Sequence, residues 1–178
     1  MKKLITTITI LLFLIIGCMD QTGITSPDNN ISITENAALL KPITVSKEIN
    51  GAAGGFITLG SLEQAKNGQC VYSYMYFPAG SFSGTKTITI SLDPNKLTGT
   101  FSPGMVFNKP VLFSALFTGV DLNGTNGSAF NFVYVAPNGQ QTIIPNSFLY
   151  IDKEKGVLGI MGAQLPHFSR YAFVKKAQ

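Results

Sequence analysis

Apolar residues recur mainly at every second position in this 178-residue chain from residue 43 onward, and this spacing constrains the fold most strongly. A period of two places alternate side chains on opposite faces of a β-strand, whereas an amphipathic helix needs a period near ~3.6. The alternating segments are short and rich in β-branched and aromatic residues. They cover residues 43–49, 55–59, 71–77, 86–92, 111–117, 130–135, 147–151, 157–160 and 169–174.

Turn signals separate these segments, among them Asn67-Gly68, Pro78-Ala79-Gly80, Asp93-Pro94-Asn95 and Pro137-Asn138-Gly139. Parallel strands would need long helical crossovers, for which the segments leave no room. Only residues 62–66 resemble a helix. We therefore expect an all-β fold, an antiparallel sandwich or barrel of about eight or nine short strands.

The first seventeen residues have the pattern of a signal peptide. Lys2 and Lys3 precede a 13-residue apolar run, Leu4 to Ile16, which ends at Gly17. A helix of that length, at about 1.5 Å per residue, is too short for a ~30 Å hydrocarbon core. Such a run is typical of the apolar region of a signal peptide and not of a membrane span.

The segment Ile15-Ile16-Gly17-Cys18 resembles the bacterial lipobox. The resemblance implies that cleavage occurs between Gly17 and Cys18 and that the Cys18 sulfur carries a diacylglyceryl group. Several buried acyl chains hold a protein on a membrane almost permanently. The alternative is an ordinary secretory signal in which the cysteine has no role.

The chain divides into three parts: a signal peptide (1–17), a lipidated N-terminus with a flexible polar tether (18–42), and a folded domain (43–178). Formal net charge is +4 for the whole chain, with 13 Lys plus Arg against 9 Asp plus Glu. Without Lys2 and Lys3 the balance becomes 11 against 9. Such a small excess argues against nucleic acid as a partner.

Four short segments, taken in order along the chain, suggest a family. Gly54-Gly55 is followed by residues 77–82 (FPAGSF), then by residues 101–111 (FSPGMVFNKPV), and finally by residues 167–172 (HFSRYA). Their order and spacing are similar to those of the ZU-five module of zonula occludens proteins, uncoordinated-five receptors and ankyrins. The resemblance implies a β-sandwich that attaches proteins in animals and whose role in bacterial envelopes is mostly unassigned.

Candidate catalytic groups are few. His167 is the single histidine, so a catalytic triad or a zinc site would have to include it. His167-Phe168-Ser169 resembles the self-cleavage tripeptide of some ZU-five relatives, which implies attack of the Ser169 hydroxyl on the Phe168 carbonyl, with a histidine accepting the proton. The alternative, which we favour, is that residues 168–174 form the closing strand. We expect no enzyme activity and no cofactor.

Two further features have ordinary interpretations. Asp121, Asn123 and Thr125 alternate as calcium ligands do, but Phe132 stands where a calcium loop has its last glutamate, so we expect a glycine-rich loop and no metal site. Cys70 has no partner once Cys18 is acylated. We expect Cys70 to be buried as a small apolar residue.

Residues 71–77 (VYSYMYF) alternate so that Tyr72, Tyr74 and Tyr76 share one face of a strand, opposite Phe77. If Phe77 faces the core, the tyrosines form a row suited to stacking on sugar rings or on another protein. The alternative is that these tyrosines are half-buried and pair with neighbouring strands.

These features together predict a lipid-anchored β-sandwich of a bacterial envelope that acts as a non-catalytic binding or structural module, with envelope proteins or glycans as partners. Met19 occupies the position where the proteobacterial inner-membrane retention signal has aspartate, which favours the outer membrane. The alternatives are self-processing before Ser169 and a carbohydrate-binding surface adhesin.

Overall fold

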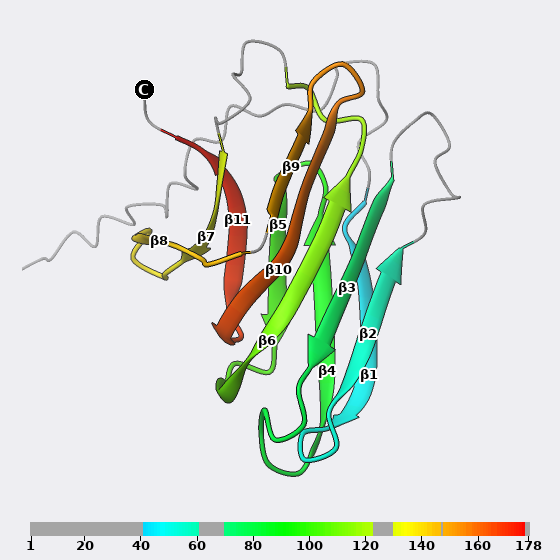
Figure 1. The fold of residues 1–178 in the computed structure, drawn as a ribbon, viewed down its shortest axis with the longest axis vertical. Helices are drawn as coiled ribbons and strands as arrows, with labels where there is room; N and C mark the ends of the chain where they lie inside the picture. Colours follow the sequence, from blue (N-terminus) through cyan, green and yellow to red (C-terminus); the bar gives the residue numbers. More distant parts are fainter. Residues whose placement is uncertain (1–40, 61–69, 123–129, 147, 177–178) are drawn as a thin grey trace, which may run out of the picture.

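The computed structural model describes residues 41–60, 70–122, 130–146 and 148–176 (Figure 1). These residues form eleven β-strands in two antiparallel sheets. The six-stranded sheet has the order β1 (Ile43–Asn50), β4 (Thr85–Asp93), β5 (Thr98–Ser102), β11 (Arg170–Lys175), β7 (Phe130–Val135), β8 (Gln141–Ile143). The five-stranded sheet has the order β2 (Gly55–Gly60), β3 (Val71–Phe77), β6 (Val106–Phe117), β10 (Val157–His167), β9 (Phe148–Asp152).

The two sheets lie face to face, with the five-stranded sheet in front in Figure 1. Alternate side chains of both sheets meet between them in one aromatic-rich core. Phe77, Phe113, Phe173 and Tyr171 are among its largest fully buried members. The all-β sandwich predicted from the period of two is therefore correct, and in the part of the chain described here no helix is long and apolar enough to cross a membrane.

The count of strands differs from the prediction for identifiable reasons. β5 is only five residues long and contains Gly99, while all three residues of β8 are exposed and show no alternation. We expected this strand to end at Ile160. Instead, β10 continues to His167 beyond a bulge between Ile160 and Ala163. Gly162 has a φ of 62° there, and the one extra residue reverses the apolar phase of the strand. The helix predicted at residues 62–66 lies outside the described residues.

Two turns show how the glycine and proline clusters return aromatic rings to the core. After β3, the Gly80 N–H donates to the Gly51 carbonyl at 2.8 Å, and Gly80 has a φ of 82°, which favours glycine. The chain then reverses and Phe82 enters the core. Between β5 and β6 the Pro103-Gly104 reversal similarly places Phe101 and Phe107 in the core.

Candidate functional site

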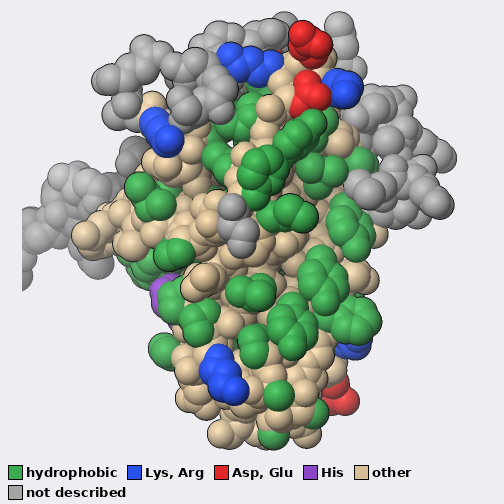
Figure 2. All heavy atoms as spheres, viewed as in Figure 1, with side chains coloured by type: hydrophobic (Ala, Val, Ile, Leu, Met, Phe, Trp, Pro, Cys, Tyr) green, Lys and Arg blue, Asp and Glu red, His purple; other side chains and the backbone are tan. Residues whose placement is uncertain are grey.

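The outer face of the five-stranded sheet carries most of the exposed apolar surface. Nine large hydrophobic side chains are exposed among the described residues, and seven of them lie on this face. They are Phe56, Tyr74, Tyr76, Leu112, Phe148, Tyr150 and Met161. Together with the half-buried Tyr72 and Leu116, these residues define what we call the aromatic face (Figure 2).

Strand register aligns the aromatic face in rows across the sheet. Tyr72 on β3 is opposite Leu116 on β6, Leu116 is opposite Gly159 on β10, and Gly159 is opposite Tyr150 on β9. A second row pairs Phe56, Tyr76 and Leu112. Directly opposite side chains lie about 4.5–5.5 Å apart at Cβ, so each row forms a continuous surface.

The predicted tyrosine row belongs to this surface. Met75 and Phe77 point into the core, so Tyr72, Tyr74 and Tyr76 point outward from β3. Tyr74 and Tyr76 are exposed, whereas Tyr72 is half-buried. The Tyr74 ring stacks on Phe56 with centroids 5.8 Å apart. The row is thus not isolated, because neighbouring strands extend it on both sides.

The aromatic face contains very little charge. The five strands that build it carry only two ionisable Lys, Arg, Asp or Glu residues, Lys109 and Asp152. The Lys109 ammonium donates to the Ala79 carbonyl at 2.7 Å, and Asp152 forms an ion pair with Lys155 at 3.4 Å. Figure 2 shows charged side chains mainly toward the two ends of the molecule. The centre of the face presents rings and aliphatic groups to the solvent.

The outer face of the six-stranded sheet is chemically different. Thr44 donates to Ser91 at 3.0 Å between β1 and β4, and the hydroxyls of Ser46 and Thr89 are 2.8 Å apart on the same pair of strands. Glu48 follows Thr44 and Ser46 on the same side of β1. Such a surface is readily hydrated. Further across the same face, Val133 and Val135 on β7 and Ala172 and Val174 on β11 form a separate apolar cluster that is buried, so this face is polar at β1 and β4 but not throughout.

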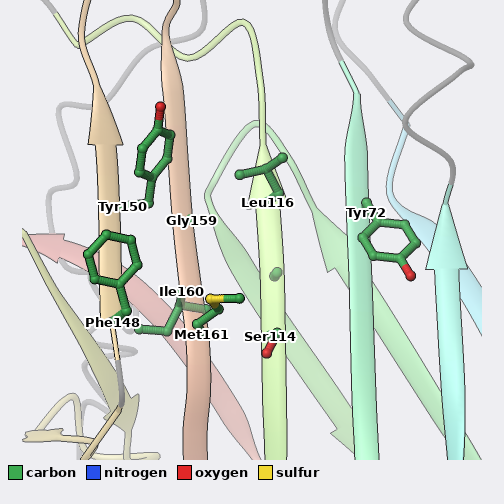
Figure 3. A pocket seen from close by; sticks show the side chains of 9 residues that line it. Tyr72, Ser114, Leu116, Phe148, Tyr150, Gly159, Ile160 and Met161 are labelled. Carbon is green, nitrogen blue, oxygen red and sulfur yellow. The ribbon is translucent and has the colours of Figure 1, made fainter.

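A pocket of about 290 Å³ opens on the aromatic face (Figure 3). Gly159 lies on its floor between Leu116 and Tyr150. A Cβ added to Gly159 would lie 2.9 Å from the Leu116 Cδ1 atom and 3.7 Å from the Tyr150 Cβ atom. The absence of a side chain at Gly159 therefore keeps this depression open. The lining residues are Tyr72, Ser114, Ala115, Leu116, Phe148, Tyr150, Gly159, Ile160 and Met161.

Sequence reasoning missed half of this site. The segment Phe148-Leu149-Tyr150-Ile151 is apolar on both faces, so its alternation does not reveal which side chains point outward. Met161 lies within the bulge of β10, between Ile160 and Ala163, where the phase changes. Only the register of β9 and β10 against β6 places these residues beside Tyr72. A run of bulky apolar residues interrupted by Gly159 is the one local signal of the pocket.

No protein-family model matches the chain. No curated protein matches it either. The aromatic face and its pocket are therefore interpreted from their own chemistry. Gly17 and Cys18, the predicted cleavage and lipidation positions, lie outside the described residues, as does most of the tether.

The tripeptide His167-Phe168-Ser169 lies at the junction of β10 and β11. Phe168 is buried against Phe107, with ring centroids 4.8 Å apart, and its N–H donates to the Met105 carbonyl at 2.8 Å. The Ser169 carbonyl accepts from the Phe101 N–H at 3.0 Å. These bonds continue the sheet around the junction. His167 is the last residue of β10.

The His167 ring contacts two tyrosines. The centroid of the His167 ring lies 4.6 Å from the centroid of the Tyr134 ring. The Tyr171 hydroxyl oxygen is 3.5 Å from His167 Nδ1, and this hydroxyl donates a hydrogen bond to the His167 backbone carbonyl at 2.6 Å. Burial raises the pKa of the Tyr171 hydroxyl, the neighbouring Tyr134 raises it further, and the bond to His167 opposes both. Leu97 is the one non-glycine residue with a positive φ in the described ranges, so the backbone at Phe168 and Ser169 lacks that kind of strain.

The remaining candidate sites have structural roles. Asp152 accepts from the Lys155 N–H at 3.1 Å in the turn between β9 and β10. This bond is the main reason that the pKa of Asp152 is lowered, with smaller contributions from the Lys155 ammonium and the Tyr150 hydroxyl and an opposing effect of burial. Cys70 is buried, and its sulfur accepts from the Thr118 hydroxyl at 3.4 Å.

The predicted glycine-rich loop is only partly described, because residues 123–129 lie outside the described ranges. Within those ranges no three His, Cys, Asp or Glu side chains are grouped so that they could hold a metal ion.

Proposed function

We propose that this protein is a lipid-anchored β-sandwich of a bacterial cell envelope, which binds a partner through its aromatic face and catalyses no reaction on external substrates. The signal-like segment and Cys18 support the anchor, and Met19 favours the outer membrane. The order of the glycine, proline and aromatic clusters supports a ZU-five-like module. Each of these points comes from the sequence.

The contrast between the two outer faces is the observation that carries the binding proposal. One face presents cross-strand hydroxyl pairs at β1 and β4 and, at β7 and β11, an apolar cluster that is buried, while the other presents seven exposed large apolar side chains and a pocket. An exposed apolar patch of this kind is typical of an interaction site. Tyrosine and phenylalanine also supply much of the binding energy at protein interfaces.

A protein partner fits the face better than a glycan. Sugar rings stack on aromatic side chains, but their hydroxyls also need polar side chains beside the ring. In the pocket these are limited to the hydroxyls of Tyr72, Tyr150 and Ser114, and Ser114 already accepts from the Gly162 N–H at 3.1 Å. We therefore place protein binding first and carbohydrate adhesion second, with the pocket as the site for a sugar ring.

Site-specific photo-cross-linking in the native envelope tests the proposal. A photoreactive phenylalanine analogue at Tyr74 should give a discrete adduct with a second protein. The same analogue at Thr100, which is exposed on the outer face of the six-stranded sheet, is the matched control and should give none.

The triple substitution Tyr72→Ser, Tyr74→Ser and Tyr76→Ser provides the second arm. It should abolish the adduct from a probe at Phe56 and leave the domain folded, because Tyr74 and Tyr76 are exposed and Tyr72 is half-buried. Equal labelling from Tyr74 and Thr100 would contradict the proposal. Binding of the unsubstituted protein to a glycan array, without a protein adduct, would select the carbohydrate alternative.

A further inference from the structure

The two lateral sides of the sandwich differ in how their edge strands are protected. On one side, β1 and β2 are the edge strands of the two sheets and are joined by a short turn at residues 51–54. The Lys47 ammonium donates to the Phe56 carbonyl at 2.9 Å and lies 4.7 Å from the centre of the Phe56 ring. Lysine is a common means by which edge strands avoid pairing with other chains. This side of the molecule is therefore protected against pairing with a strand of another chain.

The opposite side ends in β8 and β9, which follow one another in the chain and close the two different sheets (Figure 1). β8 has only three residues and lies between Pro137 and Pro145, so it offers little edge for pairing. Short strands and proline are further devices that limit edge pairing. Of the two strands, β9 alone remains long enough and regular enough to pair.

β9 has none of these protective features. Its sequence, Phe148 to Asp152, contains no proline, glycine or lysine. Among the described strands it pairs with β10 alone, so alternate N–H and C=O groups of its backbone face away from the sheet. An exposed, apolar and regular edge strand is a template for a further strand.

We propose that β9 pairs with β9 of a second copy of this chain, antiparallel and across a two-fold axis at Tyr150. In an antiparallel pair, directly opposite residues point to the same face, so a symmetric pairing that keeps the faces aligned must centre on a residue. When the pairing is centred on Tyr150, all five residues of β9 pair with the second copy. This register places Tyr150 opposite Tyr150 of the second copy, and Leu149 opposite its Ile151.

The side chains of β9 complement themselves in this register. Leu149 and Ile151 point inward, where they pack against the core and remain half-buried at the open edge. In the paired strands, Leu149 of each copy would cover Ile151 of the other copy. Asp152 lies opposite Phe148 of the second copy and already has Lys155 as its counterion at 3.4 Å, so no like charges meet. Two-fold dimers are also the commonest closed assemblies.

Dimerisation would complete the pocket. Phe148 and Tyr150 form the pocket wall nearest the open edge. In the dimer the row Tyr72, Leu116, Gly159, Tyr150 continues into the same row of the second copy, and Tyr150 of that copy becomes part of the wall. This assembly follows from the edge strand and does not depend on the partner binding or the lipid anchor proposed above.

Disulfide cross-linking tests the register directly. The chain from residue 18 onward is produced with Cys18→Ser, and Tyr150→Cys is added. Opposite Cα atoms of an antiparallel pair lie about 4.5–5.5 Å apart, which is within disulfide range. Mild oxidation should convert most of this protein into a covalent dimer. Tyr76→Cys, at an equally exposed tyrosine (41%) away from the open edge, is the matched control and should form no covalent dimer.

Sedimentation equilibrium supplies a second measurement that uses no cysteine. Tyr150→Lys should raise the dimer dissociation constant about tenfold or more, because two like charges then meet at the axis. Mixing the Tyr150→Lys and Tyr150→Glu proteins should restore a mixed dimer, whereas Tyr76→Lys should leave the dimer unchanged. A protein that is monomeric at every concentration, or no cross-link at position 150, overturns the proposal.

Discussion

Replacing Phe168 with alanine tests whether the residue at the centre of the HFS tripeptide is mainly architectural. The side chain is 4% exposed and contacts three other rings of the core. The centroid distances are 4.8 Å to Phe107, 5.7 Å to Phe101 and 6.1 Å to Phe77. We therefore expect the substitution to create a cavity where both sheets meet.

The magnitude follows from the buried area. A phenylalanine buries roughly 200 Å², and at about 25 cal/mol per Å² this corresponds to ~5 kcal/mol. Alanine retains its β-carbon, worth about 1 kcal/mol of that amount, so the loss in the free energy of unfolding is ~4 kcal/mol. This value lies within the usual range of about 3–5 kcal/mol for a buried Phe→Ala change.

Urea unfolding followed by circular dichroism measures this loss, with Phe56→Ala as the matched control. Phe56 is 51% exposed on β2, and its removal should cost less than about 1 kcal/mol. The slope of the free energy of unfolding against urea concentration should be the same for the unsubstituted protein and for both variants. A loss below about 2 kcal/mol for Phe168→Ala, or equal losses for the two variants, would refute the packing argument.

Three further outcomes are expected. Cys18→Ser should release the protein from the membrane fraction and abolish metabolic labelling with a fatty-acid analogue, whereas unchanged retention would contradict lipid anchoring. Intact-mass spectrometry under denaturing conditions should give a single uncleaved chain, because the His167 ring contacts Tyr134 and Tyr171. Loss of the fragment Ser169 to Gln178, prevented by Ser169→Ala, would instead establish self-cleavage. Above pH ~10 the unfolded chain loses the Tyr171 proton while the folded protein keeps it, so stability falls with rising pH, and Tyr171→Phe should reduce that fall in alkaline thermal melts.

The sequence by itself determined the class of fold and the local direction of side chains. The period of two is a local property of the chain, so it predicted strands and placed Phe77 opposite the tyrosines of β3 without knowledge of any neighbour. The glycine and proline clusters that the sequence contains at 78–80 and 103–104 return Phe82, Phe101 and Phe107 to the core after tight turns. Turn residues encode such reversals directly, because glycine and proline restrict the backbone locally.

Only the tertiary structure decided the order of the strands and therefore the extent of the aromatic face. Tyr72 and Tyr150 are 78 positions apart in the sequence, yet strand register places them on either side of Leu116 and Gly159. The open edge at β9 likewise has no local signature. Strand pairing depends on contacts between distant segments, whereas alternation depends only on adjacent residues, and for that reason the sequence predicted the strands but not the site that they assemble.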